Sequence, residues 1–280
     1  VLADFGLSVG ATGFWGRDNE EPFRQLFKQR NIEDRMIRLD GSTRMCVKVV
    51  NEVEGDTTDI NFPGLKPSIF DLIKLEEELE KAHAKWVVLA GSIPPGVSAS
   101  IYSDLTRKLK KQGCKVALDA SGPGLKFALE SGPDALPHLV KPNLAELEEW
   151  TGCELRSPEA ILEAAQAIVA QGVEQVMVSM GSEGALLVSR DDAIGAIPPA
   201  IEVGSTVGAG DALVAGLIAA FTRGMSTSES VRLATAFSVD VLMRSDIYAL
   251  SPETVATWSR QVSIYPVHSG KRSASIAQQF

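Results

Sequence analysis

Residues 86–119 read WVVLAGSIPPGVSASIYSDLTRKLKKQGCKVALD, and this stretch decides the fold class of the chain. The apolar run Trp86–Ala90 predicts a short strand, and residues 101–112 have the spacing of an amphipathic helix. The run Cys114–Ala120 predicts a second strand, with Asp119 at its end. A strand, a helix and another strand in this order are typical of two parallel strands joined by a crossover helix.

The same alternation of short apolar strands and helices continues along most of the chain. Further strands are predicted at Leu139-Val140, Val176–Met180 and Ala185–Ser189, and further helices at Ser157–Gln171, Asp211–Arg223 and Ser228–Met243. We therefore expect an α/β fold in which helices cover both faces of a mostly parallel central sheet.

Residues 35–62 have a different pattern. Short groups of apolar residues occur at Met36, Ile37 and Leu39, at Met45, Val47 and Val49, and at Ile60 and Phe62. Polar turns at residues 40–42 and 54–56 separate these groups, which is typical of β-hairpins. We expect a small β-sheet inserted in the α/β chain.

The composition excludes several classes of protein. The 280 residues carry 27 basic and 36 acidic side chains, a net charge of −9, with no basic stripe of the kind that binds nucleic acid. Three widely spaced cysteines without a CxxC motif argue against a disulfide framework or a zinc site. No apolar run approaches the roughly 20 residues that span a bilayer, and no signal peptide is visible. These features predict a cytoplasmic protein that binds neither nucleic acid nor a membrane.

The richest candidate for a site is Gly204-Ser205-Thr206-Val207-Gly208-Ala209-Gly210-Asp211. Its glycines allow close backbone approach, and the amides at the start of the helix that follows favour an anion. Asp211 has two interpretations, a helix-capping carboxylate or a general base beside the anion site. A base that takes a hydroxyl proton next to amides that hold a phosphoryl group suits phosphoryl transfer. Neither GxxxxGK[ST] nor GxGxxG matches this segment.

This segment resembles the second signature of the ribokinase-like, phosphofructokinase-B-type sugar kinases. Four other segments agree with the family in order and spacing: Thr43-Arg44 with Val47-Lys48, Gly91–Val97, Lys141-Pro142-Asn143 with Glu146, and Ser179-Met180-Gly181 with Gly184-Ala185. The second and third of these segments point to the branch that acts on phosphorylated ketohexoses. The resemblance implies an ATP-dependent kinase, with conversion of fructose 1-phosphate to fructose 1,6-bisphosphate as the closest match. Kinases of tagatose 6-phosphate or fructose 6-phosphate are the alternatives.

The resemblance also implies residue roles. Asp211 would deprotonate the sugar hydroxyl, and Gly208, Ala209 and Gly210 would supply amides around the γ-phosphate. On the sugar side, Arg44 would meet the existing phosphate, together with Ser92 and Lys48. The nucleotide would lie against Lys141, Asn143, Ser179, Gly181, Gly184, Ser205 and Thr206, and Glu146 would act on Mg²⁺ through water. Arg44 and Glu146 each have a second interpretation, as a solvated charge and as a carboxylate in the first turn of a helix.

The family's three-layer sandwich implies a division of the chain. Residues 1–34 and 63–268 would form the α/β kinase core, residues 35–62 a β lid that closes over the sugar, and residues 269–280 a loose tail. Because exposed lid edges commonly pair, a homodimer through the lid is expected.

The chain departs from the family at several positions. It begins after the place where relatives have a first strand, a lid strand and a glycine-rich sugar-binding run. If the 280 residues were the whole protein, we would expect weak or no activity, as in an inactive sugar-phosphate- or nucleotide-binding homologue. Cys46 stands where close relatives have Asn, and Asp240 and Arg244 place charges on a helix that is small and apolar around the adenine in relatives.

Overall fold

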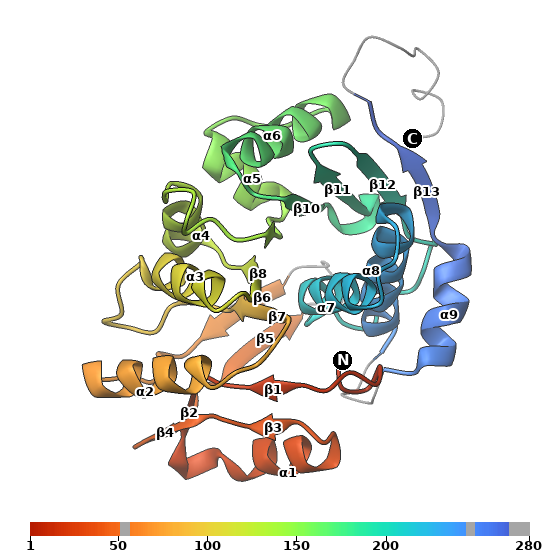
Figure 1. Ribbon diagram of the computed structural model, residues 1–280. Helices are drawn as coiled ribbons and strands as arrows, with labels where there is room; N and C mark the ends of the chain where they lie inside the picture. The colour runs from red at the N-terminus through yellow and green to blue at the C-terminus, as the bar shows by residue number, and fades with distance from the viewer. Residues whose placement is uncertain (51–56, 245–249, 269–280) are drawn as a thin grey trace. The chain divides into compact units, whose positions relative to one another are not determined.

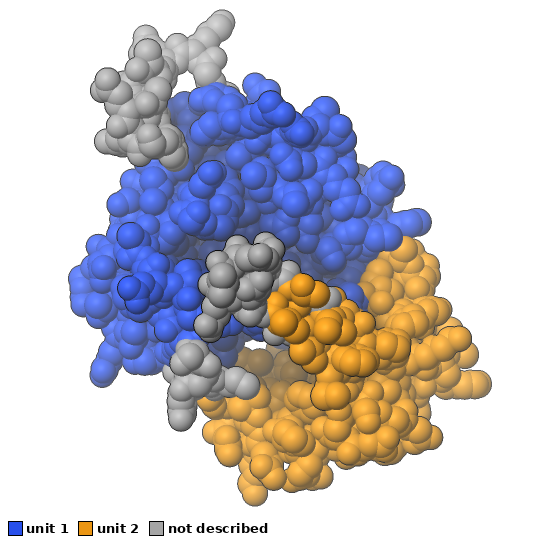
Figure 2. Space-filling model, turned by 180° about the vertical axis from the view of Figure 1, so that it is seen from behind, with its two compact units in different colours: residues 1–7, 84–92, 102–280 blue, residues 8–83, 93–101 orange. Residues whose placement is uncertain are grey.

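A computed structural model describes residues 1–50, 57–244 and 250–268, and the chain divides into two compact units (Figure 2). Unit 1 comprises residues 1–7, 84–92 and 102–280, and unit 2 comprises residues 8–83 and 93–101. The predicted lid, residues 35–62, falls within unit 2. The predicted tail, residues 269–280, lies outside the described residues.

Unit 1 contains the main sheet, whose described strands have the order β13-β12-β11-β10-β9-β8-β7. Their bounds are β7 Trp86–Ala90, β8 Lys115–Asp119, β9 Leu139–Val140, β10 Gln175–Ser179, β11 Ala185–Ser189, β12 Ala193–Ile197 and β13 Ser263–Pro266. Strands β7 to β10 run parallel to one another, and β11, β12 and β13 extend the sheet by antiparallel pairing. Parallel strands end at the same edge of the sheet, so β7 to β10 bring their carboxyl ends together.

Helices lie on both faces of this sheet. Figure 1 shows α3 to α6 along one face and α7 and α8 along the other. The bounds are α3 Ile101–Lys111, α4 Gly122–Leu129, α5 Leu144–Thr151, α6 Pro158–Gln171, α7 Ala209–Thr222, α8 Thr227–Leu242 and α9 Pro252–Gln261, with a short 3₁₀ helix, η2, at Gly181–Glu183. The predicted α/β fold, with a mostly parallel sheet between two layers of helices, is confirmed.

The closest helix packing in unit 1 is between α7 and α8. Residues 212–220 of α7 are buried, and a Cβ atom added to Gly216 would lie 2.5 Å from the Cα of Ala234. Only glycine permits this approach of the two backbones. At the other end of the contact, a Cβ on Gly208 would lie 3.8 Å from Cγ1 of Val241. The start of α7 is therefore fixed beside the last turn of α8.

The described part of unit 2 contains three small two-stranded sheets, two α-helices and a short 3₁₀ helix. Parallel pairs form between β1 (Gly10–Ala11) and β3 (Glu33–Asp34) and between β2 (Phe14–Gly16) and β4 (Ile37–Leu39). Strands β5 (Cys46–Val50) and β6 (Thr57–Asn61) form an antiparallel hairpin, and the helices are η1 (Arg17–Asn19), α1 (Glu21–Gln29) and α2 (Ile69–Glu80).

The pairing of β4 corrects part of the sequence prediction. The hairpin pattern predicted for residues 35–62 holds for β5 and β6, but β4 pairs in parallel with β2 across helix α1. The reason is a shared apolar cluster, because the buried Trp15 of β2 stacks on Phe23 of α1, with 5.4 Å between the ring centroids. Arg38 of β4 lies with its guanidinium carbon 5.3 Å from the centroid of the Trp15 ring.

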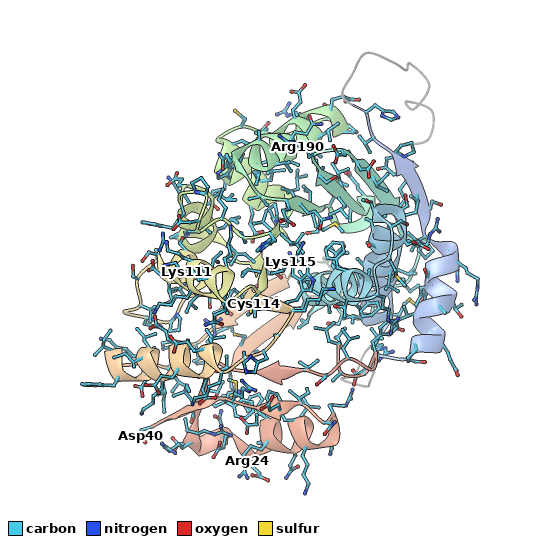
Figure 3. All side chains as sticks on the ribbon, in the orientation of Figure 1. Arg24, Asp40, Lys111, Cys114, Lys115 and Arg190 are labelled. Carbon is cyan, nitrogen blue, oxygen red and sulfur yellow. The ribbon has the colours of Figure 1, made fainter. Side chains whose placement is uncertain are left out.

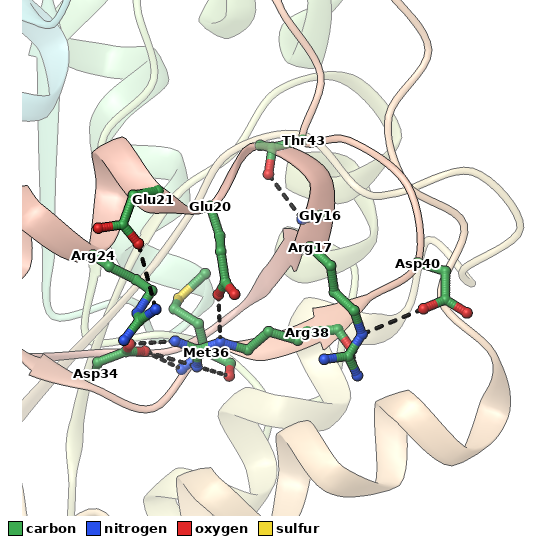
Figure 4. Close-up of polar contacts among 10 residues, drawn as sticks. All are labelled: Gly16, Arg17, Glu20, Glu21, Arg24, Asp34, Met36, Arg38, Asp40 and Thr43. Atoms are coloured by element: carbon green, nitrogen blue, oxygen red, sulfur yellow. Dashed lines mark hydrogen bonds and ion pairs between the residues drawn. The ribbon is translucent and has the colours of Figure 1, made fainter.

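Ion pairs hold the polar side of this cluster (Figure 4). Arg38 donates to Glu20 at 2.9 Å and also pairs with Asp34, and Arg17 pairs with Asp40 at 3.3 Å. These contacts tie β4 to the segment before α1. Among the described residues, no helix is both long and apolar enough to cross a membrane.

Candidate active site

Three parallel strands of unit 1 deliver polar residues to one edge of the sheet. Strand β8 ends at Asp119, β9 is followed directly by Lys141, and β10 ends at Ser179. The backbone joins them, since the Ser179 amide donates to the Pro142 carbonyl at 3.1 Å. This edge is where open α/β sheets bind their ligands.

Lys141 is the buried cation of this edge. The residue is 6% exposed, and its Nζ lies 3.1 Å from Oδ1 of Asp119. A Cβ atom on Gly210 would lie 3.4 Å from the same Nζ, so the ammonium packs against the first turn of α7. The structure thus brings Lys141 together with the glycine-rich segment, as the sequence predicts.

Asp119, which the sequence places at the end of a strand without assigning it a role, is a further candidate residue of this site. Its burial raises the pKa of its carboxyl group, the charge and hydrogen bond of Lys141 oppose this, and the charges of Asp211 and Glu146 raise it further. Asp119 therefore lies within electrostatic reach of both predicted carboxylates. The signal that could have identified it is its position, a carboxylate at the end of a buried apolar strand.

The anion-binding segment leads into α7 as predicted. Gly208 is the residue before the helix, with φ 80°, and Ala209, Gly210 and Asp211 are its first three residues. The amides of the first turn have no partner within a helix, and the first helical hydrogen bond here runs from the Ala212 amide to the Gly208 carbonyl, at 2.8 Å. Asp211 is exposed in that turn. Free amides and a solvent-facing carboxylate therefore lie side by side.

The segment that precedes α7 is held by α8. The amides of Gly204 and Ser205 donate to the Leu242 carbonyl, at 2.8 and 3.3 Å. The Ser205 hydroxyl accepts from the Val207 amide at 3.2 Å, and Thr206 lies exposed between them. Residues 204–208 are called the phosphate loop from here on.

Helix α5 begins with a capping box formed by Asn143 and Glu146. Oδ1 of Asn143 accepts from the Glu146 amide, and Oε2 of Glu146 accepts from the Asn143 amide, both at 2.8 Å. Glu146 thus has the helix-start role that was its second interpretation. The box also fixes its carboxylate close to the edge of the sheet, since its charge acts on Asp119.

The two glycines after β10 have structural reasons of their own. Gly181 has φ 61° and Gly184 has φ 98°. A Cβ on Gly184 would lie 1.9 Å from the Ala196 carbonyl oxygen, so only glycine fits against β12. Both lie just beyond Ser179, which pairs with Asn143 in a parallel bridge.

Ser92 lies near the same edge, one residue after a backbone contact to β8. The Gly91 amide donates to the Asp119 carbonyl at 3.2 Å. Tyr102 of α3 donates its hydroxyl proton to the Gly91 carbonyl at 2.6 Å and to the Ala90 carbonyl at 3.1 Å. Burial, together with the charge of Asp119, raises the pKa of Tyr102 to about 12. The phenol therefore stays a hydrogen-bond donor that shapes the Gly91-Ser92 turn.

The predicted sugar-side residues Arg44 and Lys48 belong to unit 2. The chain before Arg44 is fixed, because Oγ1 of Thr43 accepts from the Gly16 amide at 2.9 Å (Figure 4), and the Thr43 amide donates to Oδ1 of Asn19 at 2.8 Å. Arg44 itself is exposed, and its Cδ lies 3.5 Å from the position of a Cβ on Gly64. The side chain of Lys48 lies outside the described part of the structure. A joint role of these residues with Asp211 stays a prediction.

The donor set fits a magnesium ion held in part by substrate. In the part of the chain that the structure describes, no three His, Cys, Asp or Glu side chains form a ready-made metal cage. Mg²⁺ is usually bound by one or two carboxylates together with phosphates and water. Glu146 and Asp119 supply two carboxylates near the first turn of α7, which is enough for such a site.

A large groove lies at the opposite end of the unit 1 sheet. Its volume is about 1070 Å³, and its lining includes Trp86, Lys115, Gln175, Ser189 and Arg190 (Lys115 and Arg190 are labelled in Figure 3). These residues stand at the amino ends of β7, β8 and β10 and at the end of β11. None of the predicted site residues lines this groove.

Comparison with known proteins assigns the chain to a family. The model of the pfkB family of carbohydrate kinases matches residues 1–253. The 1-phosphofructokinase of Rhodobacter capsulatus is 43% identical over 94% of this chain and 83% of that protein, and that of Haemophilus influenzae is 41% identical over 88% and 78%. The structure of phosphofructokinase-2 from Escherichia coli in complex with substrates and products is 30% identical over 92% of this chain and 84% of its own, with a TM-score of 0.83. The predicted ribokinase-like fold is confirmed, and the chain belongs to the pfkB family of carbohydrate kinases.

Proposed function

We propose that this kinase uses ATP to phosphorylate fructose 1-phosphate, giving fructose 1,6-bisphosphate. The observation that carries the proposal is the buried Lys141 ammonium, set against the first turn of α7 that presents Asp211 and free amides. Relatives at 43% and 41% identity over most of their length are 1-phosphofructokinases, which favours this sugar phosphate over the alternatives.

The proposed reaction assigns one step to each group. Asp211 takes the proton of the attacking sugar hydroxyl as the new bond from that oxygen to the γ-phosphorus forms. The bond between the γ-phosphorus and the β–γ bridging oxygen breaks, and ADP leaves. The amides of Gly208, Ala209 and Gly210, with the ammonium of Lys141, stabilise the charge on the transferring phosphoryl group.

We further propose that the nucleotide lies along the strand ends of unit 1. Asn143, Ser179, Gly181, Gly184, Ser205 and Thr206 would line it. Glu146 would hold Mg²⁺ through water, with Asp119 nearby, and the ion would neutralise phosphate charge when bound. The electrostatic coupling of Asp119 to Glu146 and Asp211 supports a cation at this position.

On the sugar side we propose that Arg44 binds the existing phosphate with its planar guanidinium. Ser92 and Lys48 would contact the rest of the sugar. The β5–β6 hairpin would act as the lid, within the predicted range 35–62. Arg44 is an exposed residue of unit 2, which is compatible with this role.

The lid also supports a proposed dimer. Residues Met45, Val47, Val49, Ile60 and Phe62 are all exposed, and Val47 pairs directly with Ile60 across the hairpin. Residues directly opposite each other on the two strands lie on the same face, and so do residues two positions apart on one strand. These side chains therefore form one apolar surface. A second copy of this chain is the proposed partner. The exposed thiols of Cys46 and Cys153 fit a reducing compartment, and we propose the cytoplasm.

An ADP-release assay with fructose 1-phosphate, fructose 6-phosphate and tagatose 6-phosphate tests the proposal. We expect the highest kcat/KM with fructose 1-phosphate, and loss of roughly 10²–10⁴ of the rate in Asp211→Asn, the usual worth of a general base. Equal turnover by Asp211→Asn would refute the assigned base. Preference for another sugar would correct the substrate, and nucleotide binding without turnover would instead indicate an inactive homologue.

A further inference from the structure

We propose that the buried ion pair between Asp240 and Arg244 positions the phosphate loop, by fixing the last turn of α8 that holds residues 204–208. Asp240 and Arg244 are thus positioning residues that act through α8. The inference rests on the proposed kinase function only for its kinetic consequences.

Helix α8 contacts the phosphate loop directly. Leu242, the last residue of α8, accepts through its carbonyl from the amides of both Gly204 and Ser205. Val241 faces the position of a Cβ on Gly208 at 3.8 Å. Both ends of the phosphate loop therefore rest on two consecutive residues of α8, so any movement of this turn is passed to the loop.

The last turn of α8 is fixed by the ion pair between Asp240 and Arg244. Asp240 precedes these two residues and is 1% exposed, and its Oδ2 lies 2.5 Å from Nη2 of Arg244. Arg244 stands just beyond the helix, and its amide donates to the Val241 carbonyl at 3.2 Å. The two partners of the ion pair therefore flank Val241 and Leu242 in the sequence, and the pair holds the chain in place where the helix ends.

Helix stability alone does not account for this pair. A carboxylate near the C-terminus of a helix is disfavoured by the helix dipole, and its burial raises the pKa of Asp240 against the opposing effect of Arg244 and Trp258. Replacement of a buried ion pair by apolar residues is often neutral or stabilising. In this chain the pair is instead explained by the geometry that it fixes at the loop proposed to hold phosphate oxygens.

The position of the phosphate loop determines where the amides proposed to stabilise the phosphoryl group lie. Amides that stabilise a transition state must be held within about 0.5 Å of their productive positions. Gly208 ends the phosphate loop and Ala209 and Gly210 follow it directly, so loosening of the last turn of α8 displaces their amides. We expect weaker binding of ATP and slower phosphoryl transfer, while the KM for the sugar phosphate stays unchanged.

The test is a double variant that removes both charges without leaving one unpaired, Asp240→Leu with Arg244→Met. Its melting temperature should equal or exceed that of the wild type. Its KM for ATP should rise and its kcat fall, together by roughly 10²-fold in kcat/KM, the effect of a small misplacement of reacting groups. Arg244→Lys, which keeps the ion pair, should recover most of the kcat/KM that Arg244→Met loses.

Arg232 supplies a matched control on the same helix. Its Nη1 donates to the carbonyls of Val262 at 2.5 Å and Ser259 at 3.3 Å, and so ties α8 to the C-terminal side of α9. Arg232→Met should lower the melting temperature and leave the KM for ATP unchanged. A folded double variant with the ATP kinetics of the wild type would overturn the proposal.

Hydrogen exchange separates this inference from the proposed function. The amides of Gly204 and Ser205 should exchange faster in the double variant than in the wild type or in Arg232→Met, whether or not the protein turns over fructose 1-phosphate. Unchanged exchange would overturn the positioning role. A wild-type protein without kinase activity but with the expected exchange difference would refute only the proposed function.

Discussion

Lys141 is the single residue on which the site depends most, because a buried ammonium needs its counter-charge. Asp119 provides it at 3.1 Å. We expect Asp119→Ala to lower the free energy of unfolding by about 3–5 kcal/mol, since it leaves the Lys141 charge unpaired in the interior. Urea unfolding followed by fluorescence measures this change.

The control for Asp119 is an exposed pair on the opposite edge of the sheet, Lys115 with Glu174 at 3.1 Å. Glu174→Ala should cost only about 0–1 kcal/mol, as exposed pairs do. Equal losses of unfolding free energy in the two variants would show that Lys141 is not a buried charge that depends on Asp119 as its counter-charge. The double variant Asp119→Leu with Lys141→Met should recover stability but not kinase activity.

His138 makes stability depend on pH. Its Nδ1 accepts from the Val116 amide at 2.9 Å, which requires the neutral ring, and burial lowers the pKa of His138 below its ordinary value of 6.5. The unfolded chain therefore binds a proton before the folded chain does, and stability is lost as the pH falls from 6.5 through the folded pKa. The nearby charges that act on the ring are Glu174, which raises this pKa, and Lys110 and Lys115, which lower it.

The comparison variant for this effect is His138→Asn, whose side-chain oxygen can replace Nδ1 as the acceptor but does not titrate. We expect the unfolding free energy of the wild type to fall relative to that of His138→Asn below pH 6.5, and the difference to stay constant above it. Unfolding curves at a series of pH values measure it. A difference that does not change with pH would contradict the assigned cause.

At single positions, the sequence pointed to residues of local motifs and not to the residues that contact them. Asp211, Lys141 and Glu146 were predicted because they belong to segments of fixed spacing. Asp119 was placed at a strand end without a role and Tyr102 was missed, because their importance comes from tertiary contacts with residues distant in sequence. Only the position of Asp119 at a strand end carried a local signal.

The capping box of α5 allows the two interpretations of Glu146 to be separated at the level of the helix. Glutamine at this position can also complete a capping box, so Glu146→Gln should retain the melting temperature. It should raise the Mg²⁺ concentration needed for half-maximal activity, because a neutral amide binds a divalent cation more weakly than a carboxylate does. Titration of the ADP-release assay with MgCl₂ measures this shift.

Helix α8 supplies the matched control for Glu146. Ser226 and Glu229 form the same capping box at its start, with the Glu229 carboxylate accepting from the Ser226 amide at 2.9 Å. Glu229→Gln should change neither stability nor the Mg²⁺ requirement. If Glu146→Gln behaved in the same way, Glu146 would be a helix cap and no more.

Elements were predictable where the period was clear and hidden where it was not. Strand β11 has the predicted bounds, Ala185–Ser189, and α6 begins at Pro158, one residue after its predicted start, and ends at the predicted Gln171. Helix α4 was missed because it begins Gly122-Pro123-Gly124, residues typical of turns. The parallel pairing of β2 with β4 was missed because it depends on the packing of Trp15 against α1.

The whole molecule consists of two compact units with different parts in the proposed reaction. Unit 1 contains Asp211, Lys141, Glu146 and the phosphate loop, and unit 2 contains Arg44 and the β5–β6 hairpin. The sequence pattern separated the hairpin from the α/β part because strand alternation and strand–helix alternation have different periods. It could not reveal that β1 to β4, α1 and α2 cluster with the hairpin, since this grouping arises from contacts between distant segments.

Assembly of the whole molecule is testable through the exposed face of the hairpin. Val47 and Ile60 are a cross-strand pair, 44% and 46% exposed. Their replacement by an opposite-charge pair, Val47→Glu with Ile60→Lys, keeps a favourable contact across the hairpin but puts charges on the apolar face. We expect the wild type to sediment as a dimer and this variant to sediment near the mass of one chain, 29.9 kDa.

The matched control changes a more exposed apolar residue elsewhere in unit 2, Phe70→Lys on α2. This variant should remain dimeric, because the proposed contact uses the hairpin and not any apolar surface. Sedimentation equilibrium at several protein concentrations compares the three proteins. A wild type with the mass of one chain, or dissociation caused by Phe70→Lys alone, would contradict a lid dimer. Dissociation confined to the hairpin variant, with a raised KM for fructose 1-phosphate, would instead connect assembly to lid closure, since the same strands would serve both.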